Sequence, residues 1–252
     1  MSMILITNDD GIQSEGIKEL YEELRKKYKV VVVAPDRERS AVSRALTLYR
    51  PLRVEKINSD FYSVDGTPTD CVNLAVNSFF KGKIKMVVSG INRGPNMGED
   101  ITYSGTVSAA MEGLLLGIPS IAISCASREN FLFDTSAKVA LKIVEKVLKS
   151  GLPKDTLLNI NVPNIPFEEL KGIKITKMGK KRYSDTIVEK LDPRGRKYYW
   201  LAGEEIGYEP LGDSDLEAVK DGFVSVTPIH LDLTNYSVMD ELKGYFEKIK
   251  LS

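Results

Sequence analysis

The 252-residue chain has few of the side chains that form disulfides, bind zinc or carry protons near neutral pH. It contains two cysteines and one histidine. Cys71 and Cys125 fall outside any C-x-x-C spacing, which favours two reduced, buried thiols over a disulfide or a zinc site. His230, in "VTPIHLDLT", lies far in sequence from the polar segments described below. We interpret it as a packed or hydrogen-bonded structural group.

An excess of charge of either sign is also lacking. Lysine and arginine together number 35, as do aspartate and glutamate. The overall charge therefore provides no attraction to duplex nucleic acid or to an anionic membrane, and any anionic ligand must be met by a local site. No apolar run reaches the roughly 18 residues of a membrane span, and the N-terminus shows no basic region followed by a long apolar stretch. We expect a cytoplasmic protein.

Three common enzyme signatures are missing. The first predicted strand is not followed by G-x-G-x-x-G, and neither G-x-x-x-x-G-K-[ST] nor G-x-S-x-G occurs. These absences argue against a dinucleotide-dependent dehydrogenase, a P-loop NTPase and a hydrolase with a nucleophile elbow.

The first part of the chain alternates short β-branched runs with helical patterns, which is typical of a parallel sheet. Continuous apolar strands such as "VVVVA" are expected where helices cover both faces of the sheet. We therefore predict a doubly wound, three-layer α/β sandwich with a mostly parallel sheet. The predicted strands cover 3–7, 29–35, 85–90, 119–124 and 157–163, and the predicted helices cover about 14–28, 68–80, 104–116 and 134–149.

We predict a core over residues 1–163, interrupted by an inserted hairpin at about 48–65. Residues 164–252 form a β-rich extension with a protruding hairpin at about 181–203, built around an Asp-Pro-Arg-Gly turn, and a C-terminal helix. The second hairpin carries two tyrosines and a tryptophan, which an isolated pair of strands cannot shelter from water. We expect a partner subunit to cover it.

Three polar loops follow strands of the predicted sheet: "NDDG" at 8–11, "DRERS" at 36–40 and "GINRGPNMGEDITYSGT" at 90–106. Ligands of open α/β sheets bind beyond the carboxyl ends of the strands, so these loops share one rim. Asp9 and Asp10 repel each other unless water, hydrogen bonds or a cation compensates them. A hard divalent cation between them is one solution, with Ser40, Asn96 and water as further oxygen ligands.

The third loop is a candidate phosphate site. Its glycines let the backbone approach a ligand, and "YSGT" places Ser104, Gly105 and Thr106 where a helix begins. Amides at such a helix start can cradle phosphate. Structural interpretations remain open beside these: Asn-Asp-Asp-Gly is a good turn sequence, and Ser104 can be an N-cap and nothing more. "GTPTD" at 66–70 is best interpreted as a capping box.

Seven segments, taken together and in order, resemble those of the SurE family, the stationary-phase survival proteins. The resemblance covers Met3 to Thr234. It implies a Rossmann-like core, one divalent cation per subunit, and hydrolysis of nucleoside 5′-monophosphates, with 3′-monophosphates and short polyphosphate as further substrates in some relatives. It also implies the metal ligands Asp9, Asp10, Ser40 and Asn96, and homodimers or homotetramers formed through the C-terminal hairpin. The segments are "ILITNDDGI", "APDRERS", "GTPTDCV", "SGINRGPNMGEDITYSGTVSAAMEG", "PSIAIS", "LNINVP" and "SVTPIHLDLT".

The expected reaction is attack of water on a phosphomonoester, assisted by Mg²⁺ or Mn²⁺. The catalytic candidates are Asp9, Asn8 and Asn92, with Asp9 either binding the metal or steering the water. A transient aspartyl-phosphate remains open, although the D-x-D pattern of dehalogenase-type phosphatases is absent. The alternative functions are a non-catalytic metal and nucleotide sensor, and a metal-dependent de-N-acetylase, which needs histidines that do not lie near Asp9.

Overall fold

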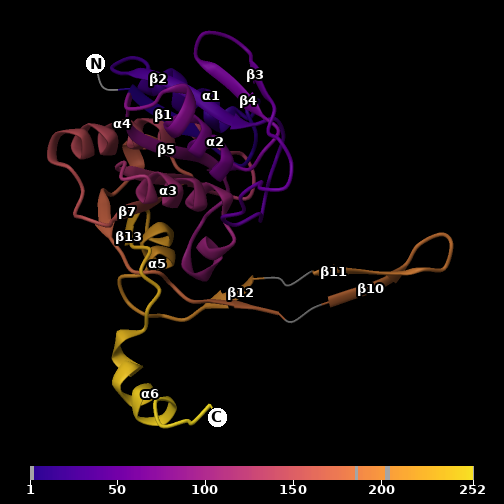
Figure 1. Cartoon of the computed structure of the whole chain (residues 1–252). Helices are drawn as coiled ribbons and strands as arrows, with labels where there is room; N and C mark the ends of the chain where they lie inside the picture. The colour runs from indigo at the N-terminus through magenta and orange to yellow at the C-terminus, as the bar shows by residue number, and fades with distance from the viewer. Residues whose placement is uncertain (1–2, 185–186, 202–204, 252) are drawn as a thin grey trace.

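A central sheet of nine strands organises the computed structural model, which describes residues 3–184, 187–201 and 205–251 (Figure 1). The strand order is β3-β4-β2-β1-β5-β6-β7-β13-β8. Six neighbouring strands pair in parallel, namely β4, β2, β1, β5, β6 and β7. Strand β3 is antiparallel to β4, and β13 is antiparallel to β7. The strands are β1 (Met3–Thr7), β2 (Lys29–Pro35), β3 (Val54–Lys56), β4 (Phe61–Val64), β5 (Ile84–Arg93), β6 (Ser120–Ala126), β7 (Leu157–Pro163), β8 (Ile173–Ile175) and β13 (Val224–Ile229).

Helices cover both faces of this sheet. On one face α1 (Glu15–Leu24) packs against α4 (Phe133–Ser150), and on the other α2 (Pro68–Leu74) packs against α3 (Gly105–Leu115). All of β1 and all of β2 after Lys29 are buried, because helices exclude water from both sides. The predicted doubly wound, three-layer α/β fold with a mostly parallel sheet is confirmed.

Two helices differ from the predicted spans. The first ends at Leu24, because the amides of Lys27 and Tyr28 both turn back to the Leu24 carbonyl and close the chain into a tight turn before β2. The helix predicted at about 68–80 is α2 followed by a π-helical segment, Ala75–Phe79. Hydrophobic patterning does not distinguish these endings from a continuous helix.

The predicted inserted hairpin at about 48–65 is shorter than expected and belongs to the main sheet. Only β3 and β4 are extended, and β4 pairs in parallel with β2. The main sheet also continues past residue 163, since β13 inserts beside β7 and β8 pairs with β13. A division into two domains at residue 163 stays a prediction.

A long arm and a terminal helix project from the body (Figure 1). The arm begins with the pair β9 (Lys181–Tyr183) and β12 (Glu205–Tyr208) and ends with the hairpin β10 (Ile187–Leu191) and β11 (Lys197–Leu201). Residues 185–186 and 202–203 of the predicted hairpin lie outside the described residues. The predicted turn is present, with the Gly195 amide bonded to the Asp192 carbonyl at 2.9 Å. The C-terminal helix is α6 (Met239–Phe246).

None of the helices in the described ranges combines the length and the apolar character that crossing a bilayer requires.

Asp215 ties the C-terminal part of the chain to the third polar loop. It opens α5 (Asp215–Lys220), is fully buried, and accepts hydrogen bonds from the amides of Gly98, Gly179 and Leu216, each at 2.8 Å. The Gly98 amide begins the short 3₁₀-helix η2 (Gly98–Thr102). One carboxylate thus fixes the start of η2 against residues more than a hundred positions later.

Replacing Asp215 with alanine is expected to lower the free energy of unfolding by about 3 kcal/mol, because buried amides lose a charged acceptor. Urea denaturation measures this. Asp221→Ala, an exposed carboxylate just after the same helix, is the matched control and is expected to change stability little. Equal stability of Asp215→Ala and the unmodified chain would show that water replaces the lost acceptor.

Candidate metal and phosphate site

A cavity of about 300 Å³ opens where the three polar loops meet. Six of the residues predicted from the sequence line it, while Asn8, Gly105 and Thr106 do not. The loops therefore do converge in space, as their positions after parallel strands predict. The lining residues are Asp9, Asp10, Glu38, Ser40, Ala41, Asn92, Arg93, Asn96, Asp100, Tyr103 and Ser104.

The topology of the sheet explains the position of this cavity. From β1 the chain moves to β2 on one side, and after β4 it crosses to β5 on the other side of β1. The loops that leave β1 and β5 therefore diverge, which opens a crevice at the carboxyl ends of these strands. Asp9 and Asp10 follow β1, and Asn92 and Arg93 end β5.

Backbone hydrogen bonds join the first two loops. The Arg39 amide donates to the Asp9 carbonyl at 2.7 Å, and the Ile12 amide donates to the Pro35 carbonyl at 2.8 Å. Gly11 has φ +93°, and a Cβ there would lie 2.9 Å from the backbone carbon of Arg37. Only glycine allows this turn and this close approach together.

Asp9 is almost fully buried against the start of α3. The Thr106 hydroxyl donates to its carboxylate, and a Cβ added at Gly105 would lie 2.8 Å from the Asp9 Cβ. Burial raises the pKa of Asp9, while the hydrogen bonds from Thr106 and the helix amides oppose that rise. The structure thus directs Gly105 and Thr106 toward Asp9, and of the three predicted phosphate-binding residues only Ser104 lines the cavity.

Asp10 is more accessible and points toward β5. It accepts a hydrogen bond from the Arg93 amide at 3.1 Å. Burial, followed by the charge of Asp9 next to it, raises the pKa of Asp10 to about 6. Two buried acidic groups with raised pKa values, placed side by side, are a typical feature of functional sites.

Asn96 is fixed by two neighbouring strands. Its amide nitrogen Nδ2 donates to Ser124 on β6 at 2.9 Å, and its backbone carbonyl accepts hydrogen bonds from Asn159 and Asn161 on β7. These two asparagines lie in "LNINVP", a predicted strand and one of the segments of the family resemblance, where neither was predicted as a site residue. Because Nδ2 is occupied, Oδ1 is the atom of Asn96 that is suited to face a cation.

Ser40 is positioned by its own loop. Its hydroxyl donates to Glu38 Oε1 at 2.6 Å. Because the hydrogen is used in this bond, the lone pairs of Ser40 Oγ point away from Glu38. Farther along this loop, Thr47 donates from both its amide and its hydroxyl to Asp70, at 3.0 and 2.6 Å. The capping box predicted for Thr67 and Asp70 is present, and Asp70 additionally anchors the loop that carries Ser40.

The remaining predicted residues make hydrogen bonds within their own loop or at the start of their own helix. Asn8 donates to the Gly11 carbonyl at 3.0 Å and to Ser14 at 2.7 Å, so it shapes the first loop from behind the cavity. Asn92 donates to the Gly94 carbonyl at 2.8 Å, and Ser104 caps α3 by accepting from the Val107 amide. Four further residues line the cavity without having been predicted, although each lies in one of the predicted polar loops: Glu38, Arg93, Asp100 and Tyr103.

The donor set suits a hard divalent cation. Asp9 and Asp10 offer carboxylate oxygens, and Ser40 and Asn96 offer neutral oxygens. In the described parts of the chain, no three histidine, cysteine, aspartate or glutamate side chains cluster as metal ligands do. Such a site would complete its coordination with water, as Mg²⁺ and Mn²⁺ sites do, and it lacks the nitrogen and sulfur ligands typical of zinc.

Comparisons with known proteins agree with this geometry. The family model described as "Survival protein SurE" matches residues 4–185. A protein of Aquifex aeolicus named "5′-nucleotidase SurE" is 54% identical over 245 residues, 96% of this chain and 98% of its own length. The chain belongs to the SurE family. A protein of Geotalea daltonii with the same name is 52% identical over 243 residues, covering 96% of this chain and 98% of its own length.

The family fold is also shown by a solved structure. The crystal structure of the SurE protein from Aquifex aeolicus superposes with a TM-score of 0.88 at 53% identity, covering 96% of this chain and 98% of that one.

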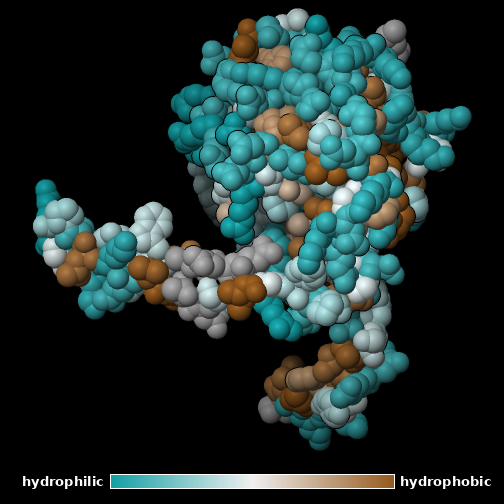
Figure 2. Space-filling model, turned by 180° about the vertical axis from the view of Figure 1, so that it is seen from behind, coloured by the Kyte–Doolittle hydropathy of each residue, from teal (hydrophilic) through white to brown (hydrophobic). Residues whose placement is uncertain are grey.

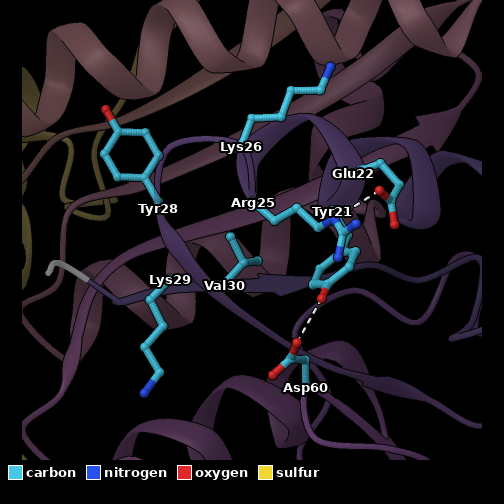
Figure 3. A pocket seen from close by; sticks show the side chains of 8 residues that line it. All are labelled: Tyr21, Glu22, Arg25, Lys26, Tyr28, Lys29, Val30 and Asp60. Carbon is cyan, nitrogen blue, oxygen red and sulfur yellow. Dashed lines mark hydrogen bonds and ion pairs between the residues drawn. The ribbon is translucent and has the colours of Figure 1, made fainter.

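A larger cavity, about 480 Å³, lies at the opposite edge of the sheet, where β2 begins (Figure 3). Its two carboxylates already have partners: the Tyr21 hydroxyl donates to Asp60 at 2.7 Å, and Arg25 Nε lies 2.9 Å from Glu22 Oε2. This cavity lies at the end where β2 begins, away from the loops that follow the parallel strands. The smaller cavity is therefore the candidate site of this SurE-family chain.

His230 is not the packed group that the sequence suggested. It is exposed and follows Ile229, which pairs with Leu157 at the start of β7. The start of a parallel strand lies at the sheet edge opposite the loops, so His230 is remote from Asp9 and Asp10.

In EDTA, the contribution of Asp10 to the free energy of unfolding is expected to fall as the pH rises from about 4 to about 7. A carboxyl whose folded-state pKa is raised stabilises the fold below its unfolded pKa and loses that contribution as the pH passes the folded value. For Asp10 this window runs from 3.8 to about 6.

Carboxyls whose pKa values are lowered, such as Asp65 and Asp192, act in the opposite direction, so variants are compared with the unmodified chain at each pH. In urea denaturation, the stability of Asp10→Asn relative to the unmodified chain is expected to rise across this range, whereas Asp60→Asn, at the opposite edge, should keep a constant difference. A constant difference for Asp10→Asn as well would contradict the assignment.

Proposed function

We propose that this chain is a divalent-metal-dependent phosphomonoesterase that hydrolyses nucleoside 5′-monophosphates to nucleoside and phosphate. Family membership supports the proposal, because the relatives described above are named 5′-nucleotidases. The observation that carries it is the cavity at the carboxyl ends of β1 and β5, where two adjacent aspartates meet neutral oxygen ligands from other loops.

The charge of the cavity explains the need for a metal. Asp9, Asp10, Glu38 and Asp100 line it, against one guanidinium, that of Arg93. A phosphomonoester carries about two negative charges near neutral pH, so this lining by itself repels the substrate. A cation bound by the aspartates reverses the sign of the local field and makes an anion-binding site.

One divalent cation per subunit, Mg²⁺ or Mn²⁺, fits the oxygen donors of Asp9, Asp10, Ser40 and Asn96. When bound, it supplies positive charge to the phosphoryl group and lowers the pKa of a nearby water.

The chain's own residues then orient the substrate. Asn92, Arg93 and Ser104 line the cavity and carry the hydrogen-bond donors suited to phosphate oxygens. Asp9, whose carboxylate is held by the Thr106 hydroxyl, either binds the metal or accepts a proton from the attacking water. Asn8 acts as a positioning residue for the first loop, and Thr106 and Gly105 hold the Asp9 carboxylate.

The alternatives are less well supported. A de-N-acetylase needs histidine ligands for zinc, and the single histidine lies at the other edge of the sheet. A non-catalytic sensor would bind nucleotide and metal without turnover, and the experiment below separates it from an enzyme.

Phosphate release from AMP with Mg²⁺ or Mn²⁺ tests the function. EDTA is expected to abolish it, and Asp9→Asn is expected to lower kcat/KM by at least about a hundredfold, because a charged ligand and proton acceptor is lost. Asp60→Asn, which removes a carboxylate from the other cavity, is expected to keep full activity. Nucleotide binding without release in any metal would favour the sensor.

We also propose that the arm forms homodimers or homotetramers. Tyr198 and Trp200 on β11 are 40% and 61% exposed, far from the body (Figure 1), and apolar side chains recur along the arm (Figure 2). Exposed aromatic surface of this kind is typical of an interface. The buried, unpaired cysteines Cys71 and Cys125 agree with a reducing compartment, and we propose a cytoplasmic location.

Light scattering at micromolar concentration is expected to show an oligomer for the unmodified chain. Combining Tyr198→Ser with Trp200→Ser removes apolar surface from the arm and is expected to shift the mass toward the monomer, whereas Ile57→Ser, an exposed residue of the main sheet's edge hairpin, should leave it unchanged. A monomeric unmodified chain would refute the interface.

A further inference from the structure

The lining of the site is polar except at one place. Nine of its eleven residues have a charged, hydroxyl or amide side chain. The other two are Ala41, which offers a methyl group, and Tyr103, which offers an aromatic ring. These two come from different loops, which are bonded together: the Ser43 amide donates to the Tyr103 carbonyl at 3.1 Å, and the Ser43 hydroxyl donates to the Thr102 carbonyl at 2.9 Å. A methyl group and an aromatic ring therefore lie on the wall of an otherwise charged cavity.

Hydrogen bonds fix the backbone of Tyr103, whereas its ring has no hydrogen-bond or ring partner within 3–184, 187–201 and 205–251. The Tyr103 amide donates to the Asp100 carbonyl at 3.0 Å, and the next amide, that of Ser104, donates to the Ile101 carbonyl at 3.3 Å. The side chain is 67% exposed, and among the described residues it makes no hydrogen bond or ring contact. The buried aromatic rings of this chain pack against one another instead, as Tyr21 does with Phe61.

An aromatic ring exposed at the wall of a binding cavity leaves apolar surface in contact with water in the free protein. Its apolar face gains from being covered, and a nucleobase covers it well because every base has a flat π-face. The proposed phosphate-binding groups, Asn92, Arg93 and Ser104, have no such preference, since they would recognise phosphate by charge and hydrogen bonds alone.

We propose that Tyr103 is the stacking face for the nucleobase, and that it makes this site select nucleotides over sugar phosphates. This inference rests on the proposed phosphatase function. Tyr103 is adjacent in sequence to Ser104, with Cα atoms about 3.8 Å apart, so the ring lies within a short reach of the phosphate-binding groups. A ribose unit spans that interval, which leaves the base at the ring while the phosphate occupies the charged part of the cavity.

The stacking contact forms equally in the bound substrate and in the transition state, so it acts on KM and leaves kcat nearly unchanged. The phenolic hydroxyl takes no part in it. Phenylalanine at this position therefore preserves selectivity, and alanine removes it.

The test compares AMP with ribose 5-phosphate in Mn²⁺, using the unmodified chain, Tyr103→Ala and Tyr103→Phe. The ratio of kcat/KM for AMP to kcat/KM for ribose 5-phosphate is expected to fall about tenfold in Tyr103→Ala, through KM, and to stay unchanged in Tyr103→Phe. Tyr49→Ala is the matched control, because Tyr49 is fully exposed on the neighbouring loop and does not line the cavity.

Parallel losses for both substrates in Tyr103→Ala, or an unchanged ratio, would overturn the inference, because either result assigns the ring a structural role or none. Calorimetric titration of AMP into each variant separates this from the function itself. If the unmodified chain releases no phosphate from either compound, the phosphatase proposal fails, while about tenfold weaker AMP binding by Tyr103→Ala still supports stacking. Equal AMP affinity in both would reject stacking whatever the activity.

Discussion

The burial of two adjacent carboxylates, those of Asp9 and Asp10, is the constraint around which this end of the molecule is built. Burial raises the pKa values of both groups, and the charge of Asp9 raises that of Asp10 further. The raised values express the cost of placing two acidic groups at a buried strand end. The surrounding structure compensates only part of it, through the Thr106 hydroxyl and the Arg93 amide. A divalent cation would supply the positive charge that is still missing, and under the proposed function the site would bind phosphate through that cation.

The fold was predictable because its signals are local and repeated. Buried strands covered by helices on both faces need continuous apolar runs, and "MILIT" and "KVVVVAP" have them. The pairing of strands that are far apart in the sequence leaves no such pattern in the local sequence. The insertion of β13 beside β7 depends on two strands separated by more than sixty residues, and hydrophobic pattern alone did not place it in the main sheet. The same holds for the parallel pairing of β4 with β2.

The site, like the fold, was predictable only in part. Asp9, Asp10, Ser40 and Asn96 were named because oxygen-bearing side chains follow parallel strands, and the cavity brings these residues together. The groups that orient them were not found, since their roles depend on contacts. Asn159 and Asn161 look like ordinary strand residues until their amides meet the Asn96 carbonyl. Asp70 satisfies a capping box, and only the structure shows it also anchoring Thr47.

The position of β13 has a consequence for any attempt to work with residues 1–163 in isolation. A fragment ending at residue 163 would leave β7 as an open edge, with a row of unpaired amide and carbonyl groups that β13 satisfies in the whole chain. It would also lack Asp215, and with it the acceptor that fixes the Gly98 amide. Such a fragment would expose a template for intermolecular strand pairing directly beside Asn159 and Asn161. Aggregation and a loosened metal site would then arise from the same cut.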